Sequence, residues 1–579
     1  MRLFYLTFLV CLGMQSFAQQ TPFEKSQKQE TATYLEAIRY YQDLDATYAQ
    51  AKLFSYGMTD FGEPLRLLVL SKDKNFDPEL IRKQQKRILL INNGIHPGEP
   101  EGIDASMMLA RDLLKNNKLP DNVVICIIPL YNIDGSYNRT SISRANQNGP
   151  LAYGFRGNSR NLDLNRDFIK TDSKNSASFQ QIFNIWKPEV FVDTHTSNGA
   201  DYQYTMTLIP TQKDKLNATL SAYLTGQMVP SLYKEMAGKG YELIPYINSV
   251  EETPDAGITG FLEPARFSTG YAALHNAIGF MPETHMLKAY DKRVDATYKL
   301  LETYINIVSR DAKQIGLNKK KADEEVASQE VFPLEWKLNK DLYDSIPFKG
   351  FTAKKKPSAV SGKDRLYYDR NAPFEKHIKQ WNNYEPAVSV KKPVAYVIPQ
   401  AWNRVVELLK LNGVKVQQLS NDTRLDLEMY YIKDYKTAAA PYEGHYIHSA
   451  VQVNPVKQTL QFYKGDFLVY TNQPQNRYIV ETLEPQGTDS FFNWNFFDSI
   501  LGQKEHYSAY VFEDTAAQLL KDNPELKSLL EQEKAKNPDL AKSASAQLQF
   551  VYKNSAYYEK THLRYPVGRL LVPIAETIK

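Results

Sequence analysis

The chain has 579 residues, of which 42% are hydrophobic and 23% charged, a balance typical of a folded globular protein with enough apolar mass for more than one core. Lysine and arginine number 70 against 66 for aspartate and glutamate, so the formal net charge is only +4. So small a net charge excludes a strong positive electrostatic potential for binding nucleic acid or acidic membranes, and we expect no nucleic-acid partner.

The first 18 residues are predicted to be a signal peptide. An apolar run at 3–12 is followed by the small residues Ser16 and Ala18, where a signal peptidase cuts. We therefore expect a mature chain that starts at Gln19 and is exported, either to the periplasm or into the medium. Cys126 is then the one remaining thiol, which leaves no internal disulfide. No later stretch approaches about 18 consecutive apolar residues, so no transmembrane segment is expected.

Up to about residue 317, apolar strand-like runs alternate with helical periodicity, which is the pattern of an α/β fold. This pattern assigns residues 19–317 to a first domain. The stretch 317–330 is rich in Lys, Asp and Glu without an apolar pattern, so residues 318–345 are predicted to form a linker. Buried strands are predicted at 87–92, 122–130, 190–194 and 278–282, and helices at 103–114 and 295–315.

Residues 346–579 are expected to form a second, α+β domain. The segment 394–418 has the pattern strand, helix, strand, and 431–470 is rich in Tyr, Val, Ile and Thr, which favours β structure. Residues 523–544 form a polar stretch with helical character. The sequence does not disclose the role of this accessory domain.

The strongest chemical signal is the segment 92–100, which reads N-N-G-I-H-P-G-E-P and lies between a predicted strand and a predicted helix. It places His96 and Glu99 three residues apart on a loop shaped by glycine and proline, so both side chains can reach one metal ion. About a hundred residues later, His195 directly follows the strand predicted at 190–194. A His/Glu/His set leaves a fourth zinc position open for water.

Two further motifs lie between these residues: N-I-D-G at 132–135, and N-L-D-L-N-R at 161–166. In this chain order the motifs resemble those of the zinc carboxypeptidase family, the carboxypeptidase A-like funnelins, whose members carry H-x-x-E, N-P-D-G, D-x-N-R, a lone His and a late Glu. The resemblance covers roughly residues 24–288, and Ile133 replaces the usual proline. It implies a mixed sheet flanked by helices and a zinc enzyme that hydrolyses peptides with a free C-terminus.

Carried onto this chain, the resemblance also implies roles for individual residues. Asn165 and Arg166 would hold the terminal carboxylate of a peptide, and Asp163 would orient His96 from behind. The ligands of the single zinc ion would be His96, Glu99 and His195.

The resemblance also points to the groups that act on the scissile bond. Arg156 stands nine residues before Asn165, where the cytosolic carboxypeptidase branch places the arginine that polarises the scissile carbonyl; Arg144 and Arg160 are rivals for this role. Glu283 ends an apolar strand and is expected to be the general base, which takes a proton from the attacking water and delivers it to the leaving amine.

Three further residues near Glu283 are candidates for the site. His285 could compete as a zinc ligand, although the family supplies only two imidazoles. No tyrosine clearly matches the family's mobile substrate-capping tyrosine, and Tyr271 is the candidate. Arg266 lies in the region that lines the specificity pocket in relatives, where it could pair with an acidic side chain or a second carboxylate.

Independent support comes from the predicted sheet. His96, His195 and Glu283 each fall at or just beyond the carboxyl end of a predicted strand, the edge at which open α/β sheets bind ligands. Other functions remain open: an exported zinc amidase that acts on cell-wall stem peptides, or an aspartoacylase-like amidohydrolase that acts on N-acyl amino acids and also uses a D-L-N-R segment. A non-catalytic peptide-binding module would normally have lost a ligand or the base, and here none is missing.

Overall fold

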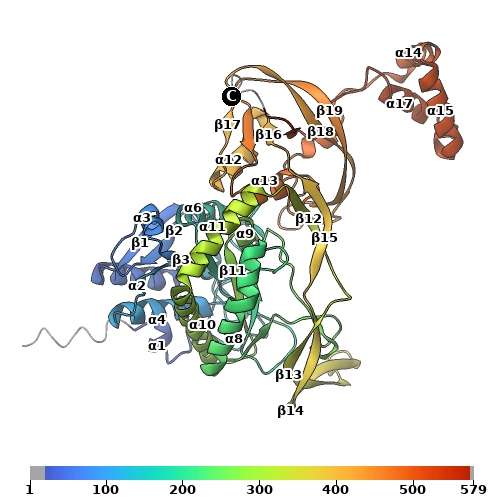
Figure 1. Cartoon of the computed structure of the whole chain (residues 1–579). Helices are drawn as coiled ribbons and strands as arrows, with labels where there is room; N and C mark the ends of the chain where they lie inside the picture. The colour runs from blue at the N-terminus through green and yellow to red at the C-terminus, as the bar shows by residue number, and fades with distance from the viewer. Residues whose placement is uncertain (1–19, 574–579) are drawn as a thin grey trace, which may run out of the picture.

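The structure is a computed structural model that describes residues 20–573 (Figure 1). The expected signal peptide at 1–18 lies outside the described residues and stays a prediction. Across residues 20–573, no helix is both long enough and apolar enough to cross a bilayer.

A mixed sheet of nine strands lies at the centre of the first half of the described chain. Its order is β1-β2-β4-β3-β5-β11-β7-β8, and β6 pairs with the end of β11. The central strands β4, β3, β5 and β11 are parallel, whereas β2 and β7 run antiparallel to their neighbours β4 and β11. The strands are β1 Ala51–Met58, β2 Pro64–Leu70, β3 Arg87–Asn92, β4 Val123–Ile128, β5 Val190–Asp193, β6 His195–Ser197, β7 Met206–Pro210, β8 Leu243–Pro245 and β11 Ile278–His285.

The strand predictions are confirmed, with one change that matters for the site. Strand β3 has the predicted bounds, and β4 and β5 lie inside the predicted segments. Strand β11 begins at Ile278 as expected but continues to His285, because β6 pairs with its residues 283–285 in addition to the pairing with β5 and β7. Glu283 therefore lies within the strand, directly beside His195 in the register of β6.

Helices cover both faces of this sheet, because successive residues of the central strands point to opposite sides. In β3, Leu89 and Ile91 join the core formed with α2, α4, α8 and α10, whereas Ile88 and Leu90 join the core formed with α6 and α9. The helices are α2 Tyr34–Thr47, α4 Glu101–Lys115, α6 Lys174–Trp186, α8 Val229–Gly238, α9 Ser268–Leu274 and α10 Tyr290–Arg310. The predicted α/β architecture, a mixed sheet flanked by helices, is thus present.

The prediction for residues 295–330 was wrong in two respects. The helix expected at 295–315 ends at Arg310, and a new helix, α11, runs over Ala312–Ser328. The stretch expected to be a linker, 318–345, is therefore helical up to Ser328 and continues into the strand β12 (Val331–Leu338). The many charged residues hide the apolar pattern of this helix in the sequence. In the structure they form i,i+4 ion pairs on the solvated side, such as Lys319 with Asp323, while Ala322 and Val326 are buried.

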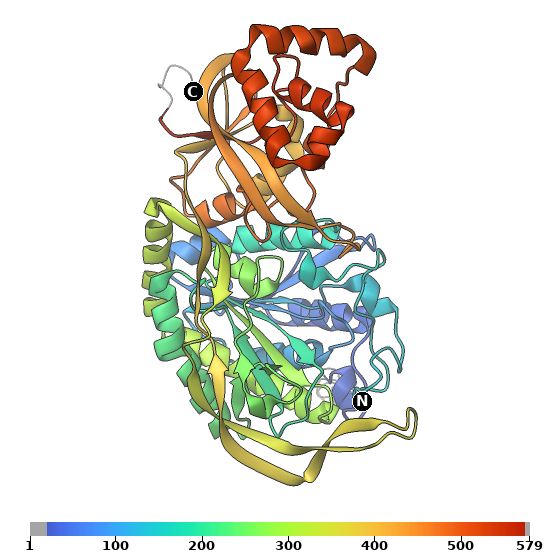
Figure 2. The same ribbon diagram turned by 90° about the vertical axis from the view of Figure 1, so that its right-hand side faces the viewer.

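The second half of the chain contains further sheets (Figure 2). A six-stranded sheet, of order β17-β20-β16-β21-β18-β19, stacks on one end of the first half, and the hairpin β13–β14 runs along the other end. Strands β12 and β15 form the ribbon between these regions. These strands are β12 Val331–Leu338, β13 Asp344–Pro357, β14 Asp364–Trp381, β15 Tyr384–Lys391, β16 Ala395–Ile398, β17 Gln417–Gln418, β18 Thr423–Thr437, β19 His448–Phe462, β20 Phe467–Tyr470 and β21 Gly568–Leu570.

The helices of the second half fall into two groups. Helices α12 (Asn403–Leu411) and α13 (Asn476–Leu483) pack into the same core as α6 and α9, so one hydrophobic core joins the two halves. Helices α14 (Ala509–Asp522), α15 (Pro524–Lys536), α16 (Pro538–Lys542) and α17 (Ala544–Lys553) form a separate core, and α14, α15 and α17 stand apart in Figure 1. The predicted patterns at 394–418, 431–470 and 523–544 are confirmed in kind, whereas the division into domains stays a prediction.

Candidate active site

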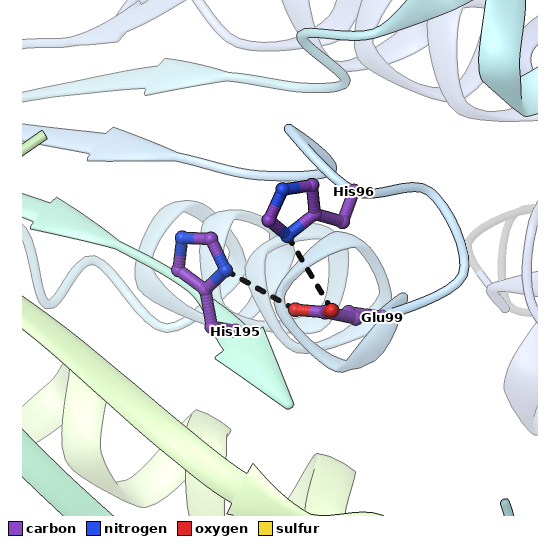
Figure 3. A group of neighbouring side chains, drawn as sticks. All are labelled: His96, Glu99 and His195. Carbon is purple, nitrogen blue, oxygen red and sulfur yellow. Dashed lines mark hydrogen bonds and ion pairs between the residues drawn. The ribbon is translucent and has the colours of Figure 1, made fainter. Parts of the chain in front are cut away.

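The structure brings His96, Glu99 and His195 together (Figure 3). His96 and Glu99 lie on the loop between β3 and α4, and His195 begins β6. One potential ligand atom from each of these residues lies within 4.8 Å of the others. Nδ1 of His96 is 3.4 Å from Oε1 of Glu99, and Nδ1 of His195 is 3.1 Å from Oε2. Two imidazole nitrogens and a carboxylate therefore converge, which is a donor set that zinc accepts.

Two carboxylates hold the imidazoles from behind. Nε2 of His96 is 2.8 Å from Oδ1 of Asp163, and Nε2 of His195 is 2.9 Å from Oδ2 of Asp193. A proton held at Nε2 leaves the lone pair at Nδ1, on the side where the donors converge. Asp163 takes the position that the sequence predicts for it. Asp193 was missed, although its place two residues before His195 at the end of β5 was a usable signal.

The surroundings of Glu99 keep this buried carboxyl group ionised. Burial would raise the pKa of Glu99, but Arg144 and the two imidazoles outweigh it and hold the pKa well below its usual range. Nη1 of Arg144 donates to Oε1 of Glu99 over 2.7 Å, and Nη2 donates to the carbonyl of Thr196 over 2.8 Å. Its Nε donates to Gln147 over 2.7 Å, so all three guanidinium nitrogens of Arg144 are engaged.

Arg156 reaches the same group but remains open to solvent. Its Nη1 lies 3.2 Å from Oε1 of Glu99, its Nε donates to Oδ2 of Asp163 over 2.9 Å, and 44% of its side chain is exposed. Arg160 is directed elsewhere, because it donates to the carbonyl of Asp172. Of the rival arginines, only Arg144 and Arg156 contact Glu99.

The N-I-D-G motif at 132–135 holds the loop that carries Arg156. Asn132 accepts from the backbone N–H of Gly135 over 2.9 Å and donates to the carbonyl of Arg156 over 2.9 Å. A Cβ atom at Gly135 would lie 2.5 Å from the carbonyl oxygen of Phe155, closer than real Cβ contacts allow. The motif therefore fixes the position of the loop that carries Arg156 through hydrogen bonds and close packing.

Asn165 and Arg166 lie at the wall of the same cavity. The side-chain oxygen of Asn165 accepts from the backbone N–H of Ser268 over 3.2 Å. The guanidinium of Arg166 lies over the ring of Phe267, with 4.1 Å between its central carbon and the ring centroid.

Glu283 also lines this cavity, and across residues 20–573 its carboxylate has no hydrogen bond or ion pair. Burial raises the pKa of Glu283 to about 8, and the neighbouring charge of Glu99 contributes, while His195 and Arg156 act in the opposite direction. An unpaired carboxyl group beside a metal-binding group, with its pKa near neutrality, is suited to accept and release a proton.

Comparison with known proteins agrees with this geometry. Residues 37–267 match the family model described as zinc carboxypeptidase. This part of the chain belongs to the zinc carboxypeptidase family. The chain is thus a metallocarboxypeptidase, and members of this family depend on zinc. Glu283 lies beyond the matched residues.

Relatives of this carboxypeptidase are distant. Carboxypeptidase 2 of Trichophyton rubrum is 22% identical over 423 residues, which cover 69% of this chain and 72% of the relative. Carboxypeptidase 2 of Trichophyton tonsurans is 22% identical over 442 residues, with the same coverage. Among solved structures, the metallo-carboxypeptidase of Burkholderia cenocepacia is 14% identical, with a TM-score of 0.36 over 48% of this chain and 70% of that one.

Three sequence-predicted residues of the carboxypeptidase do not reach the cavity. Tyr271 is fully buried, and its hydroxyl donates to the side chain of Asn412 over 2.6 Å. Arg266 lies with its Nε 2.8 Å from a carboxylate oxygen of Asp489. Nε2 of His285 is hydrogen-bonded to a backbone carbonyl, and its Nδ1 accepts from a backbone N–H. These contacts remove Tyr271 as a capping tyrosine, Arg266 as a pocket residue and His285 as a ligand.

Other residues that line the cavity carried no sequence signal. The cavity has a volume of about 460 Å³. Tyr246, which directly follows β8, lines the cavity, and the centroid of its ring lies 6.0 Å from that of Phe261. Glu263 is buried and accepts a hydrogen bond from Thr269, but its Oε1 has no hydrogen-bond partner in the described part of the chain. The missed residues of the wall include Ile209, Tyr246, Phe261, Glu263, Phe267 and Met281.

Proposed function

We propose that this metallocarboxypeptidase removes the C-terminal residue from peptides with a single zinc ion per chain, held by His96, Glu99 and His195. The observation that carries the proposal is that one cavity joins this group to the unpaired carboxylate of Glu283 and to the guanidinium of Arg166. Metal, proton acceptor and carboxylate partner are the three elements that hydrolysis of a terminal peptide bond requires.

The residues present fit a zinc ion. Nδ1 of His96 is a buried nitrogen that makes no hydrogen bond within residues 20–573, although it faces Glu99. A buried nitrogen without a partner is costly, and a cation would satisfy it. A bound zinc ion supplies a Lewis acid that polarises a carbonyl group and lowers the pKa of water to roughly 7.

Glu283 is proposed as the general base. Its carboxylate takes a proton from the attacking water and later delivers it to the amine that leaves. The cationic group of Arg156 favours the ionised form of Glu283, which is the form that accepts a proton, and so opposes the effect of burial on its pKa.

Arg156 is proposed to stabilise the carbonyl oxygen of the scissile bond as negative charge develops on it. Its guanidinium lines the cavity beside Glu99 and keeps 44% of its surface exposed, so it has room to contact a substrate. Arg144 is only 16% exposed and is occupied by Glu99 and Thr196. We assign Arg144 the role of holding Glu99 and not of contacting the peptide.

Arg166 and Asn165 are proposed to hold the free carboxylate of the peptide. A guanidinium group can pair with a carboxylate through two parallel hydrogen bonds. The oxygen of the Asn165 amide is taken by the N–H of Ser268, so its NH₂ group is the part left for a substrate. A carboxylate fixed here places the last peptide bond, rather than an internal one, at the metal group.

A matched pair of peptides tests the proposal. The same sequence is offered with a free and with an amidated C-terminus, and the products are identified by mass spectrometry. We expect release of one residue at a time from the free acid and little turnover of the amide, because a neutral group leaves Arg166 without its partner. Internal cleavage, or equal turnover of both peptides, would contradict the exopeptidase function.

The same assay separates the alternatives. Muropeptides and N-acyl amino acids are added as further substrates in separate reactions. Turnover of these compounds with no turnover of free-acid peptides would favour the zinc amidase, and binding of peptides without turnover would favour a non-catalytic binding module.

A further inference from the structure

A loop from the second half of the chain reaches the wall of the catalytic cavity. The loop joins β18 to β19 and covers residues 438–447, and we refer to it as the 438–447 loop. At its tip, Tyr442 and His445 pair as a β-bridge, so Glu443 and Gly444 form a tight two-residue turn. Nothing in the zinc carboxypeptidase match, which ends at 267, includes this loop.

Three side chains of the loop contact the segment that carries the D-L-N-R motif. The hydroxyl of Tyr442 accepts a hydrogen bond from Nε of Arg166 over 3.0 Å. Oε2 of Glu443 accepts one from the backbone N–H of Asp163 over 2.7 Å. Farther from the cavity, Nε2 of His445 lies 2.8 Å from Oδ2 of Asp172. The loop thus binds both ends of residues 163–172.

The contact with Tyr442 determines which edge of Arg166 is free. Nε is taken by Tyr442, Nη1 donates to the carbonyl of Asn165 over 2.9 Å, and Phe267 covers one face of the guanidinium. Across residues 20–573, Nη2 donates to no protein atom. The guanidinium is therefore held at Nε and at Nη1, which also lies 3.7 Å from Oδ2 of Asp163, while Nη2 remains for a carboxylate.

The contact with Glu443 is made in spite of an unfavourable backbone conformation. Glu443 has φ = +50° and Gly444 has φ = +85°. A two-residue turn with positive φ at both positions favours Asn, Asp or Gly at the first, because a longer side chain gains nothing there and strains the backbone. The side chain of Glu443 accepts a hydrogen bond from the backbone of Asp163, and the carboxylate of Asp163 orients both His96 and Arg156. A strained residue that contacts the site is a candidate for a functional role.

The loop has rigid support. The ring of Tyr442 stacks on Trp494 with 6.4 Å between the centroids, and Arg266 lies against both rings. Arg266 is also paired with Asp489 over 2.8 Å. Trp494 belongs to the core that the two halves share, so the loop is part of the packed molecule and can hold a side chain in place.

We propose that the second half of the chain completes the substrate site, with Tyr442 as a positioning residue for Arg166 and Glu443 as a positioning residue for Asp163. The inference rests on the proposed function in that Arg166 is taken to bind the carboxylate of the peptide. It assigns the second half a direct part in substrate binding.

The first test replaces Tyr442 with phenylalanine in the full chain, which removes only the hydroxyl and keeps the ring stacked on Trp494. We expect Tyr442→Phe to raise KM for a free-acid peptide about 5- to 10-fold, the usual effect of one lost hydrogen bond, with kcat, zinc content and turnover of the amidated peptide unchanged. Tyr446→Phe is the matched control, because Tyr446 lies on the same loop with an exposed ring; we expect no change there.

A double-mutant cycle shows whether Tyr442 acts through Arg166. In an Arg166→Ala background, Tyr442→Phe should have no further effect on KM. If Arg166→Ala lowers the preference for free acids but Tyr442→Phe leaves KM unchanged, Tyr442 does not position Arg166 and that part of the proposal is overturned. If Arg166→Ala itself leaves the preference intact, the carboxylate role of Arg166 fails, and the role of Tyr442 fails with it.

The second test uses Glu443→Asn, which suits the turn better but is too short to reach Asp163. We expect an unchanged or higher unfolding midpoint together with a fall of about 10-fold in zinc affinity or in kcat, the scale typical when an outer partner of a ligand is lost. A merely structural role would lower stability and activity together. Wild-type activity and zinc affinity in Glu443→Asn would overturn the role of Glu443, whatever the outcome for Tyr442.

Discussion

The two sides of the catalytic cavity are built in different ways. On the metal side, His96, Glu99 and His195 are fixed by Asp163, Asp193 and Arg144, all within a stretch of about a hundred residues of the first half. On the carboxylate side, the second half of the chain adds to the support: Tyr442 holds Nε of Arg166, and Asp489 pairs with Arg266.

This difference has a physical reason. A metal site needs several donors within a few ångströms, and the shared edge of adjacent parallel strands brings them together without help from outside the sheet. A carboxylate clamp on a loop needs an external support, because a long arginine side chain loses much rotational freedom when it is held in one orientation. We therefore expect damage to the metal side to abolish the chemistry, and damage to the carboxylate side to weaken binding.

The largest effect should come from the metal side. His96→Ala and His195→Ala should each lose zinc and fall to background activity, because the remaining donors are too few to hold the ion. Metal analysis of the purified variants measures this directly. His285→Gln is the control, because both ring nitrogens of His285 are bonded to the backbone, and it should keep one zinc per chain. Full zinc content in both alanine variants would remove these ligands from the proposal.

The next effect concerns the chemical step alone. Glu283→Gln keeps the shape of the side chain but cannot accept the proton of water, so kcat should fall about 10²- to 10⁴-fold while zinc content stays the same. KM should change far less than kcat. Steady-state kinetics with a free-acid peptide provides the measurement. Near wild-type kcat would show that another group is the base.

A third prediction compares the two sides directly through their arginines. Arg156→Ala should lower kcat by about 10²- to 10³-fold, the scale for losing one donor to a developing oxyanion. Arg166→Ala should act mainly on KM, by roughly 10- to 100-fold, because it removes a charge-assisted pair with the ground-state carboxylate. The same kinetic split in both variants would show that the two sides of the cavity are not functionally distinct.

The sequence predicts the metal side of the cavity better than the carboxylate side. Strand β3 and the loop with His96 and Glu99 are predictable, because a continuous apolar run and a short-range motif are both local signals. Glu283 is placed by its position on the last central strand. These features depend on a few neighbouring residues and on how parallel strands align.

The remaining features depend on contacts between distant residues. The loop tip meets the D-L-N-R segment across about 280 residues, and no periodicity reports such a contact. Tyr271 and Arg266 were misplaced because distance along the chain does not show which face a side chain takes: Tyr271 lies in α9 and points into the core, and Arg266 meets Asp489. Helix α11 was missed because, beyond residue 317, Ala322 and Val326 are its only buried apolar residues among many charges.

The smallest expected effect concerns Glu263, on the wall of the cavity between the two sides. Burial raises the pKa of this carboxyl group to about 8, from an ordinary value near 4.5. The folded protein therefore keeps a proton that the unfolded chain releases once the pH exceeds about 4.5. The contribution of Glu263 to stability is most favourable below that pH, falls as the pH rises towards 8, and then levels off.

Glu263→Gln removes this titration while keeping the shape of the side chain. In protein depleted of metal with a chelator, the variant should match the wild type in unfolding free energy near pH 5 and exceed it near pH 9, by on the order of 1 kcal/mol or more. Denaturant midpoints of the variant and the wild type are measured at both pH values. All other titrating groups are present in both proteins, so their contributions cancel in the difference between them. Glu513→Gln, at an exposed position of α14, is the control and should shift stability equally at both. A difference for Glu263→Gln that is independent of pH would mean that the carboxyl group is ionised in the folded state, and the cavity would then carry a fixed negative charge beside Arg166 rather than a neutral acid.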